Sequence, residues 1–225
     1  MKPPAVGYAR AGDVSEAVAL LAEHGTDAKL LAGGQSLVPL MSFRLARPSV
    51  LVDINRVAGL DRIARENGHL MVGAMTRLRD LETSPVAADA SPLVPEALGY
   101  VGHVAIRNRG TVGGSLAHAD PAAELPTLVT ALDGELEVRG PGGPRAVAAA
   151  DFFTGPFTTA LDHDEILTAL RLPWLPGGTG VAMHELARRH GDFAIVGAMA
   201  AVHVGPDGTV DFARVAASGV GPVPA

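Results

Sequence analysis

Cysteine is absent from the 225-residue chain, and this absence removes several classes of site at once. Without thiolates the chain can form no disulfide, no cysteine-ligated zinc site and no iron–sulfur cluster of its own. Aromatic residues make up only 4%, and the 18 basic residues are outnumbered by 24 acidic ones, which gives a formal net charge of −6. A nucleic-acid-binding surface needs basic clusters and stacking platforms, so none is expected.

Long apolar runs are also lacking. No stretch approaches the roughly 20 apolar residues of a membrane-spanning helix. The first residues, Met1-Lys2-Pro3-Pro4, lead into polar sequence and do not resemble the apolar core of a signal peptide. Together with the lack of cysteine, this leads us to expect a cytoplasmic protein without a membrane span.

The remaining composition, 48% hydrophobic and 19% charged, is typical of a globular protein with one large domain or two smaller ones. Asp13 can cap a helix that runs to Glu23, and Ser91-Pro92 and Asp120-Pro121 are similar start signals. Strands are predicted at 29–32, 50–54, 69–72 and 165–172, and hairpins at 135–148 and 194–218. Residues 173–180, rich in proline and glycine, are the best candidate for a linker.

Two loops with paired glycines are the most informative features. The first loop, Ala32-Gly33-Gly34-Gln35-Ser36-Leu37, directly follows a predicted strand, and the second loop is Thr111-Val112-Gly113-Gly114-Ser115-Leu116. Paired glycines let the backbone approach a ligand closely, and successive amide N–H groups can form a nest for an anion. Two such loops could hold a diphosphate from both sides, although either loop alone reads more simply as a tight turn. The G-x-G-x-x-G and Walker A patterns are absent, so a Rossmann or P-loop site has no support.

Longer stretches around both loops resemble the FAD-binding medium subunits of molybdenum hydroxylases, the family of carbon monoxide dehydrogenase and xanthine dehydrogenase. Residues 30–39 and 51–55 are similar to the family's first FAD loop, and residues 106–126 to its second. Gly191-Asp192-Phe193-Ala194 resembles a third, weaker signature. The resemblance spans nearly the whole chain, and its second stretch is long and specific.

The resemblance implies an α+β fold. Its first part is a two-subdomain FAD-binding domain of the vanillyl-alcohol-oxidase (PCMH) type, and a small α+β domain follows. We therefore expect the FAD-binding domain at 1–175, with subdomains at about 1–57 and 58–175. Residues 176–225 are expected to form a truncated C-terminal domain, or to lean on the first domain, because a lone hairpin is rarely stable.

The resemblance also implies which residues bind FAD, without a covalent bond to it. Both loops are expected to wrap the diphosphate, and Lys29 lies just before the first. Glu124 matches an acidic residue that contacts the ribose, Leu167 an apolar residue on the adenine, and His118 a position that faces the cofactor. The expected cofactor-binding set is Lys29, Ala32, Gly33, Gly34, Gln35, Ser36, Leu37, Val101, Gly102, Thr111, Gly113, Gly114, Ser115, His118, Glu124, Leu167, His184 and Phe193.

The chain departs from the family pattern near the flavin. Val101 and Gly102 match positions that line it. His184 lies where some relatives have a lysine, and Phe193 where some have a tyrosine, so a flavin-gating role for Phe193 is in doubt. We expect no catalytic acid or base in the chain, because FAD is then the reactive group.

Other polar residues have structural interpretations that compete with a role in binding. His118, Asp120 and Glu124 do not have the i, i+4 spacing of a helical metal pair, and Asp120 is better explained as a helix N-cap, so no metal is expected. His184 and His190 read more simply as surface histidines.

Loop-flanking residues have competing interpretations too. Arg107 and Arg109 are expected to form structural ion pairs and not to bind phosphate. For Asp53, tying the loop backbone and touching the ligand remain equally open. Ser36 and Ser115 lack the G-x-S-x-G setting of a hydrolase nucleophile.

The function implied by the resemblance is that of an electron-transfer subunit. A molybdopterin-containing large subunit would oxidise substrate, and a small subunit with [2Fe–2S] clusters would feed electrons to FAD. An external acceptor (NAD, quinone or oxygen) would then take them, so a hetero-oligomer is expected. Two alternatives remain: a self-sufficient flavin-dependent oxidoreductase, which needs a proton donor at the flavin, and a non-catalytic binding or scaffold protein with purely structural glycine turns.

Overall fold

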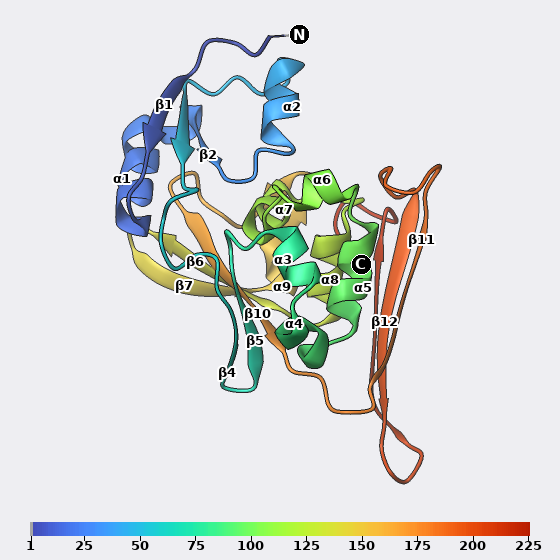
Figure 1. Ribbon diagram of the computed structural model, residues 1–225. Coiled ribbons are helices and arrows are strands. Elements are labelled where there is room, and N and C mark those ends of the chain that lie inside the picture. The colour runs from blue at the N-terminus through green and yellow to red at the C-terminus, as the bar shows by residue number, and fades with distance from the viewer. Residues whose placement is uncertain (1) are drawn as a thin grey trace.

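A small parallel sheet forms the first part of the chain in the computed structural model, which describes residues 2–225 (Figure 1). Its strands β1 (Gly7–Arg10), β2 (Ala28–Leu31) and β3 (Val50–Asp53) are arranged in the order β1-β3-β2, with both pairs parallel. The crossover helix α1 (Val14–His24) begins where the Asp13 carboxylate accepts a hydrogen bond from the Glu16 N–H, at 2.8 Å. The predicted helix and both predicted strands are thus confirmed, with shifts of about one residue at their ends.

A five-stranded antiparallel sheet forms the second part. It has the order β4-β5-β10-β6-β7, so the late strand β10 lies in its centre. The strands are β4 (Ile63–Glu66), β5 (His69–Gly73), β6 (Glu135–Gly140), β7 (Gly143–Ala148) and β10 (Ile166–Pro173). Because β10 pairs with strands far away in sequence, residues 63–173 close into one unit whose core is shared by sheet and helices.

Short helices connect the sheets and carry several of the buried leucines, among them Leu93, Leu98, Leu125 and Leu128. They are α2 (Leu37–Ser42), α3 (Leu78–Glu82), α4 (Pro85–Ala90), α5 (Leu93–Tyr100), α6 (Val104–Arg107), α7 (Val112–His118), α8 (Glu124–Ala131) and α9 (Ala149–Phe152). A minimal ribbon, β8 (Phe153–Gly155) with β9 (Thr158–Thr159), follows α9. None of the helices described for residues 2–225 has the length and apolar character needed to cross a bilayer.

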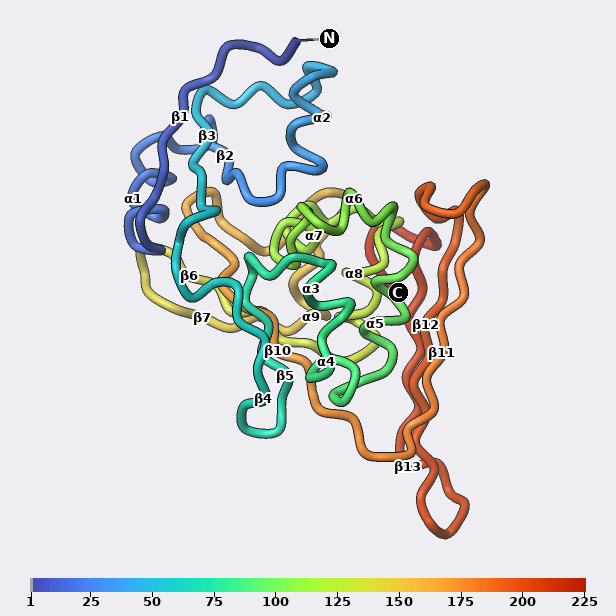
Figure 2. Tube along the Cα trace, in the orientation of Figure 1, coloured from blue at the N-terminus to red at the C-terminus, as the bar shows by residue number. Residues whose placement is uncertain are grey.

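The last strands form a three-stranded antiparallel sheet, β11 (Gly180–Leu186), β12 (Val196–Val204) and β13 (Val210–Ser218). Figures 1 and 2 show this sheet on the opposite side of the molecule from α1, beside α5 and α8. Met183 and Met199 are buried in the same core as the helices. The predicted hairpin at 194–218 is confirmed as β12 and β13, with β11 as a third strand that the sequence did not predict. The sheet leans on the helical core, which is one of the two arrangements expected for this region.

Two predicted helix starts are displaced. Ser91 does not cap α5, which begins after Pro92, and its hydroxyl is buried without a partner among the described residues. Asp120 does not cap α8 either. Its carboxylate accepts a hydrogen bond from the Ala122 N–H at 2.9 Å, so a local turn separates Asp120 from the helix that begins at Glu124.

Candidate cofactor-binding site

A cavity of about 680 Å³ opens where the parallel sheet meets the helices of the second part. This volume is within the roughly 300–1,000 Å³ of small-molecule sites. Every residue of the predicted cofactor-binding set except His184 lines it. His184 is exposed on β11, whose alternation instead turns its neighbour Met183 into the core. We therefore remove His184 from the candidate site, and its interpretation as a surface histidine holds.

The first loop has open backbone donors. No hydrogen-bond acceptor within residues 2–225 pairs with the amide N–H groups of Gly33, Gly34, Gln35 and Ser36. Gly34 has a φ of +71°, which glycine adopts without strain and which reverses the chain between β2 and α2. Consecutive unpaired amides with a left-handed residue among them form the kind of nest that binds an anion.

Side chains behind the first loop hold it in place. The Asn55 amide group donates hydrogen bonds to the carbonyls of Leu31 and Ala32, at 3.1 and 2.9 Å. Asp53 in turn accepts from Asn55, and Arg77 donates to the Asn55 side-chain oxygen at 2.8 Å. Asp53 therefore acts as a tie for the loop backbone, which is one of the two interpretations that the sequence left open.

The second loop differs from the first in its hydrogen bonds. The Val112 and Gly113 N–H groups donate to the carbonyls of Thr76 and Ala74, and the Gly114 N–H donates to the Thr111 hydroxyl at 3.1 Å. The Ser115 N–H donates to the Thr111 carbonyl. The expectation of a second amide nest is thus wrong, because this loop is the capped first turn of α7 and its donors are already used.

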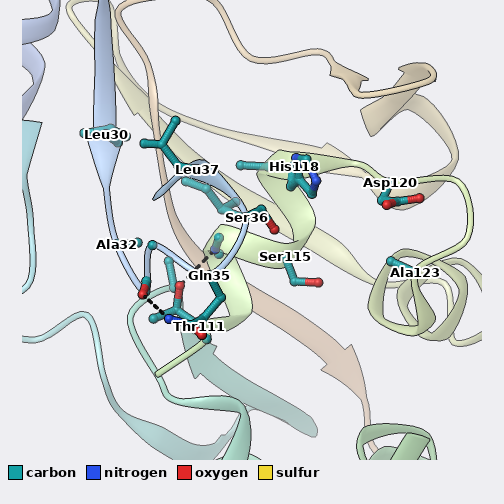
Figure 3. A pocket seen from close by; sticks show the side chains of 18 of the residues that line it. Leu30, Ala32, Gln35, Ser36, Leu37, Thr111, Ser115, His118, Asp120 and Ala123 are labelled. Carbon is teal, nitrogen blue, oxygen red and sulfur yellow. Dashed lines mark hydrogen bonds between the residues drawn. The ribbon is translucent and has the colours of Figure 1, made fainter. Parts of the chain in front are cut away.

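The glycines bring the two loops into contact. A Cβ on Gly33 would lie 2.3 Å from the Arg109 carbonyl oxygen, and one on Gly113 would lie 2.6 Å from the Ala74 Cβ. Neither position can hold a larger residue without a backbone shift. Figure 3 shows Ser36, Thr111 and Ser115 around one opening, so the second loop supplies hydroxyl groups and a close-packed wall in place of amides.

Two ionisable groups beyond the loops have shifted pKa values. Burial raises the pKa of Glu124 to about 7, and the nearby carboxylates of Glu185 and Asp120 add to the shift, while Arg107 opposes it. Burial lowers the pKa of His118, against the opposing effect of Asp120. At neutral pH the cavity wall therefore has a neutral imidazole and a carboxyl group that can either donate or accept a hydrogen bond.

The two arginines have different roles. Arg107 is buried, pairs with Glu82 at 2.7 Å and donates to the Val101 carbonyl at 2.9 Å, so its predicted structural role is confirmed. The predicted ion pair of Arg109 is wrong, since no carboxylate within residues 2–225 pairs with its exposed guanidinium. Among the same residues no group of three His, Asp or Glu side chains is placed to hold a metal ion.

Sequence reasoning missed much of the cavity lining. Leu21, Ile54 and Ile166 contribute an apolar end, and Asp120 faces the cavity in addition to bonding its own turn. The ribbon β8–β9 contributes Phe157 and its neighbours. These residues come from segments far apart in the chain and do not belong to a glycine motif, so no local sequence pattern identifies them as part of the cavity.

Comparisons with known proteins agree with this geometry. Residues 4–175 match the family described as the FAD binding domain in molybdopterin dehydrogenase. The chain is 44% identical to the alpha subunit of the 6-hydroxypseudooxynicotine dehydrogenase complex of Paenarthrobacter nicotinovorans, over 98% of this chain and 75% of that one. It is 41% identical to the carbon monoxide dehydrogenase medium chain of Hydrogenophaga pseudoflava, over 99% and 77%.

Solved structures give the same result. A chain of carbon monoxide dehydrogenase from Hydrogenophaga pseudoflava superimposes with a TM-score of 0.97 at 41% identity, covering 100% of this chain and 78% of that one. Quinoline 2-oxidoreductase from Pseudomonas putida 86 gives a TM-score of 0.94 at 40% identity, covering 100% and 77%. The fold described above is thus shared along the full length of the chain.

Proposed function

The chain belongs to the family of FAD-binding domains of molybdopterin dehydrogenases, and from this premise we propose that it is the electron-transfer subunit of a molybdenum-containing hydroxylase. The predicted family, the α+β fold and FAD as the cofactor are confirmed, and the chain is a component of an oxidoreductase. A purely structural scaffold is excluded by this membership. The proposal concerns the path of the electrons, the partners and the residues that hold FAD.

The residues of the cavity suit FAD. Leu21, Ile54 and Ile166 offer an apolar surface at one end for adenine, and the four open amides of the first loop offer donors for a diphosphate. The Glu124 carboxyl group can bond a hydroxyl group of the sugar chain. We propose the predicted set, without His184 and with Asp120, as the FAD-binding residues.

FAD, when bound, supplies both one-electron and two-electron redox chemistry. The chain's own residues would bind and orient it. The observation that supports FAD binding most directly is the row of unpaired amides in the first loop, within the residues that match the FAD-binding family. In the proposed function, electrons arrive from the [2Fe–2S] clusters of a small subunit and leave to an external acceptor, while a large subunit holds molybdopterin.

Relatives and exposed apolar side chains support the proposed partners. The relatives are named as the alpha subunit of a dehydrogenase complex and as a medium chain, which are parts of larger assemblies. Phe43 and Leu45, neighbours at the end of α2, are 64% and 77% exposed, and large apolar side chains that lie together on a surface are a feature of docking faces. We also propose the division at residue 175, where the family match ends, and a cytoplasmic location.

Gly33→Ala tests the site. Since the new Cβ would collide with the Arg109 carbonyl, we expect the loops to separate and the Kd for FAD to rise by at least about tenfold, which is about 1.4 kcal/mol. Gly177→Ala is the matched control, because a Cβ there meets nothing within 4 Å. FAD retention is read from visible absorption after desalting. Equal FAD retention by wild type, Gly33→Ala and Gly177→Ala would contradict the assignment of the first loop to the FAD site.

A second candidate function is favoured by Glu124. A self-sufficient flavin oxidoreductase needs a proton donor at its flavin, and a carboxyl group with a pKa of about 7 in the cavity wall could serve. The discriminating assay is turnover by the FAD-loaded chain alone with small reductants and oxygen. Turnover abolished by Glu124→Gln would favour this alternative over the electron-transfer subunit.

A further inference from the structure

Phe157 has an unfavourable backbone conformation at the edge of the cavity. It follows Pro156 in the turn between β8 and β9, and its φ of +56° lies in the left-handed region that bulky residues rarely adopt. A proline followed by a positive φ is the arrangement of a type II turn, in which glycine is the usual second residue. The side chain is 58% exposed, so burial in the core does not compensate for the strain.

The end of α7 holds this turn in place. The Phe157 N–H donates to the Ala119 carbonyl at 2.9 Å, and Ala119 itself has a φ of +49°. The centroids of the Phe157 and His118 rings are 5.2 Å apart with an interplanar angle of 45°, which is a favourable aromatic contact. Two strained residues from distant segments are therefore joined by a hydrogen bond, and they hold two rings side by side.

Both rings line the cavity. Leu30 packs on the apolar cluster that contains Ile166, the end proposed for adenine. Figure 3 places His118 across the first loop from Leu30, near Ser36 and Ser115. The ring pair therefore faces the other half of the cavity. Burial lowers the pKa of His118, so that ring is uncharged at neutral pH and suited to an aromatic neighbour.

We propose that Phe157, backed by His118, packs against the flavin half of bound FAD, and that the strained turn exists to place its ring there. The inference rests on the proposed FAD site and adds a binding residue to it. Backbone strain of this kind persists where surrounding contacts impose it, and it clusters at ligand clamps. An exposed aromatic ring beside a cavity gains most from a flat partner, and in FAD's second half that partner is the isoalloxazine ring.

Phe157→Ala tests the contact, with Phe43→Ala as the matched control. Phe43 is an exposed phenylalanine, 64% exposed at the end of α2, and it does not line the cavity. We expect the Kd for FAD to rise about tenfold in Phe157→Ala, the scale of one stacking contact with an aromatic side chain, and to stay unchanged in Phe43→Ala. The affinity for ADP, measured by competition with FAD, should stay at the wild-type level, because ADP lacks the flavin.

Phe157→Gly separates strain from contact. Glycine adopts a positive φ freely, so this variant without FAD should melt at a higher temperature than Phe157→Ala while binding FAD equally weakly. An FAD affinity of Phe157→Ala within twofold of wild type would overturn the inference, as would an equal loss of ADP affinity. A wild-type chain that binds no FAD would instead refute the proposed site as a whole.

Discussion

Replacing Glu124 by glutamine is expected to change how the stability of the protein depends on pH. Glu124 lies in the first turn of α8, is 9% exposed, and has no ion-pair partner within residues 2–225. Burial raises its pKa from 4.5 to about 7, with smaller contributions from Glu185 and Asp120. The folded state therefore holds the proton more tightly than the unfolded state does.

The sign follows from the two pKa values. Below pH 4.5 the carboxyl is protonated in both states, so its burial has no electrostatic cost, whereas above about pH 7 the folded state must bury a charge. Stability is thus lost as the pH rises through this window. The difference, about 7 minus 4.5, is about 2.5 pKa units, and at 1.36 kcal/mol per unit the largest effect is about 3 kcal/mol.

Urea denaturation of the FAD-free protein between pH 5 and 8 measures this effect. Glutamine cannot ionise, so Glu124→Gln should be more stable than wild type at pH 8, by up to about 3 kcal/mol, and the difference should shrink to less than about 1 kcal/mol at pH 5. Glu23→Gln, an exposed position on α1, should follow the wild-type curve. If the free energies of unfolding of Glu124→Gln and wild type change in parallel with pH, burial does not disfavour the ionised Glu124 carboxylate, and the argument from its burial is refuted.

Two further substitutions examine the framework around the first loop. Asn55→Ala removes hydrogen bonds to the loop carbonyls, and losing about 1 kcal/mol of loop order should weaken FAD binding roughly fivefold in absorbance titrations, with little change in unfolding. Arg107→Met leaves the mostly buried Glu82 with Arg79 as its remaining, more exposed partner and should cost about 3 kcal/mol in urea unfolding. Arg79→Met keeps the buried Arg107 pair and should cost less than about 1 kcal/mol.

The sequence predicts well those features whose cause is local. The Asp13 cap depends on neighbours in the chain, and the extents of the strands at 28–31 and 50–53 follow from short apolar runs. The paired glycines are equally visible as a local motif. The family resemblance adds the residues of the cavity wall, including Glu124 and Leu167, that no local pattern would single out.

The remaining features depend on contacts between distant segments. Asp120-Pro121 predicts the start of a helix. In the structure the Asp120 carboxylate accepts a hydrogen bond from the Ala122 N–H, which forms a local turn, and α8 begins only at Glu124. A pair of glycines indicates that another group approaches the backbone closely, but it does not show whether the glycine N–H groups are already hydrogen-bonded within the protein. The Gly113 N–H donates to the Ala74 carbonyl, and only the fold brings that carbonyl near. Phe157 would not be expected in a cofactor site at all, because its turn is held by the end of a helix far away in sequence.

The unequal loops explain why the site needs both of them. The open amides of the first loop can bind an anion, and that loop is held through its carbonyls, several of which accept hydrogen bonds, and through the contact of Gly33 with Arg109. The second loop gives up its amides to its own fold and is rigid for that reason, so it can act as the surface against which the first loop is set. A second open nest would bind an anion more strongly in isolation but would leave neither loop fixed. Preorganisation therefore favours one binding loop and one supporting loop.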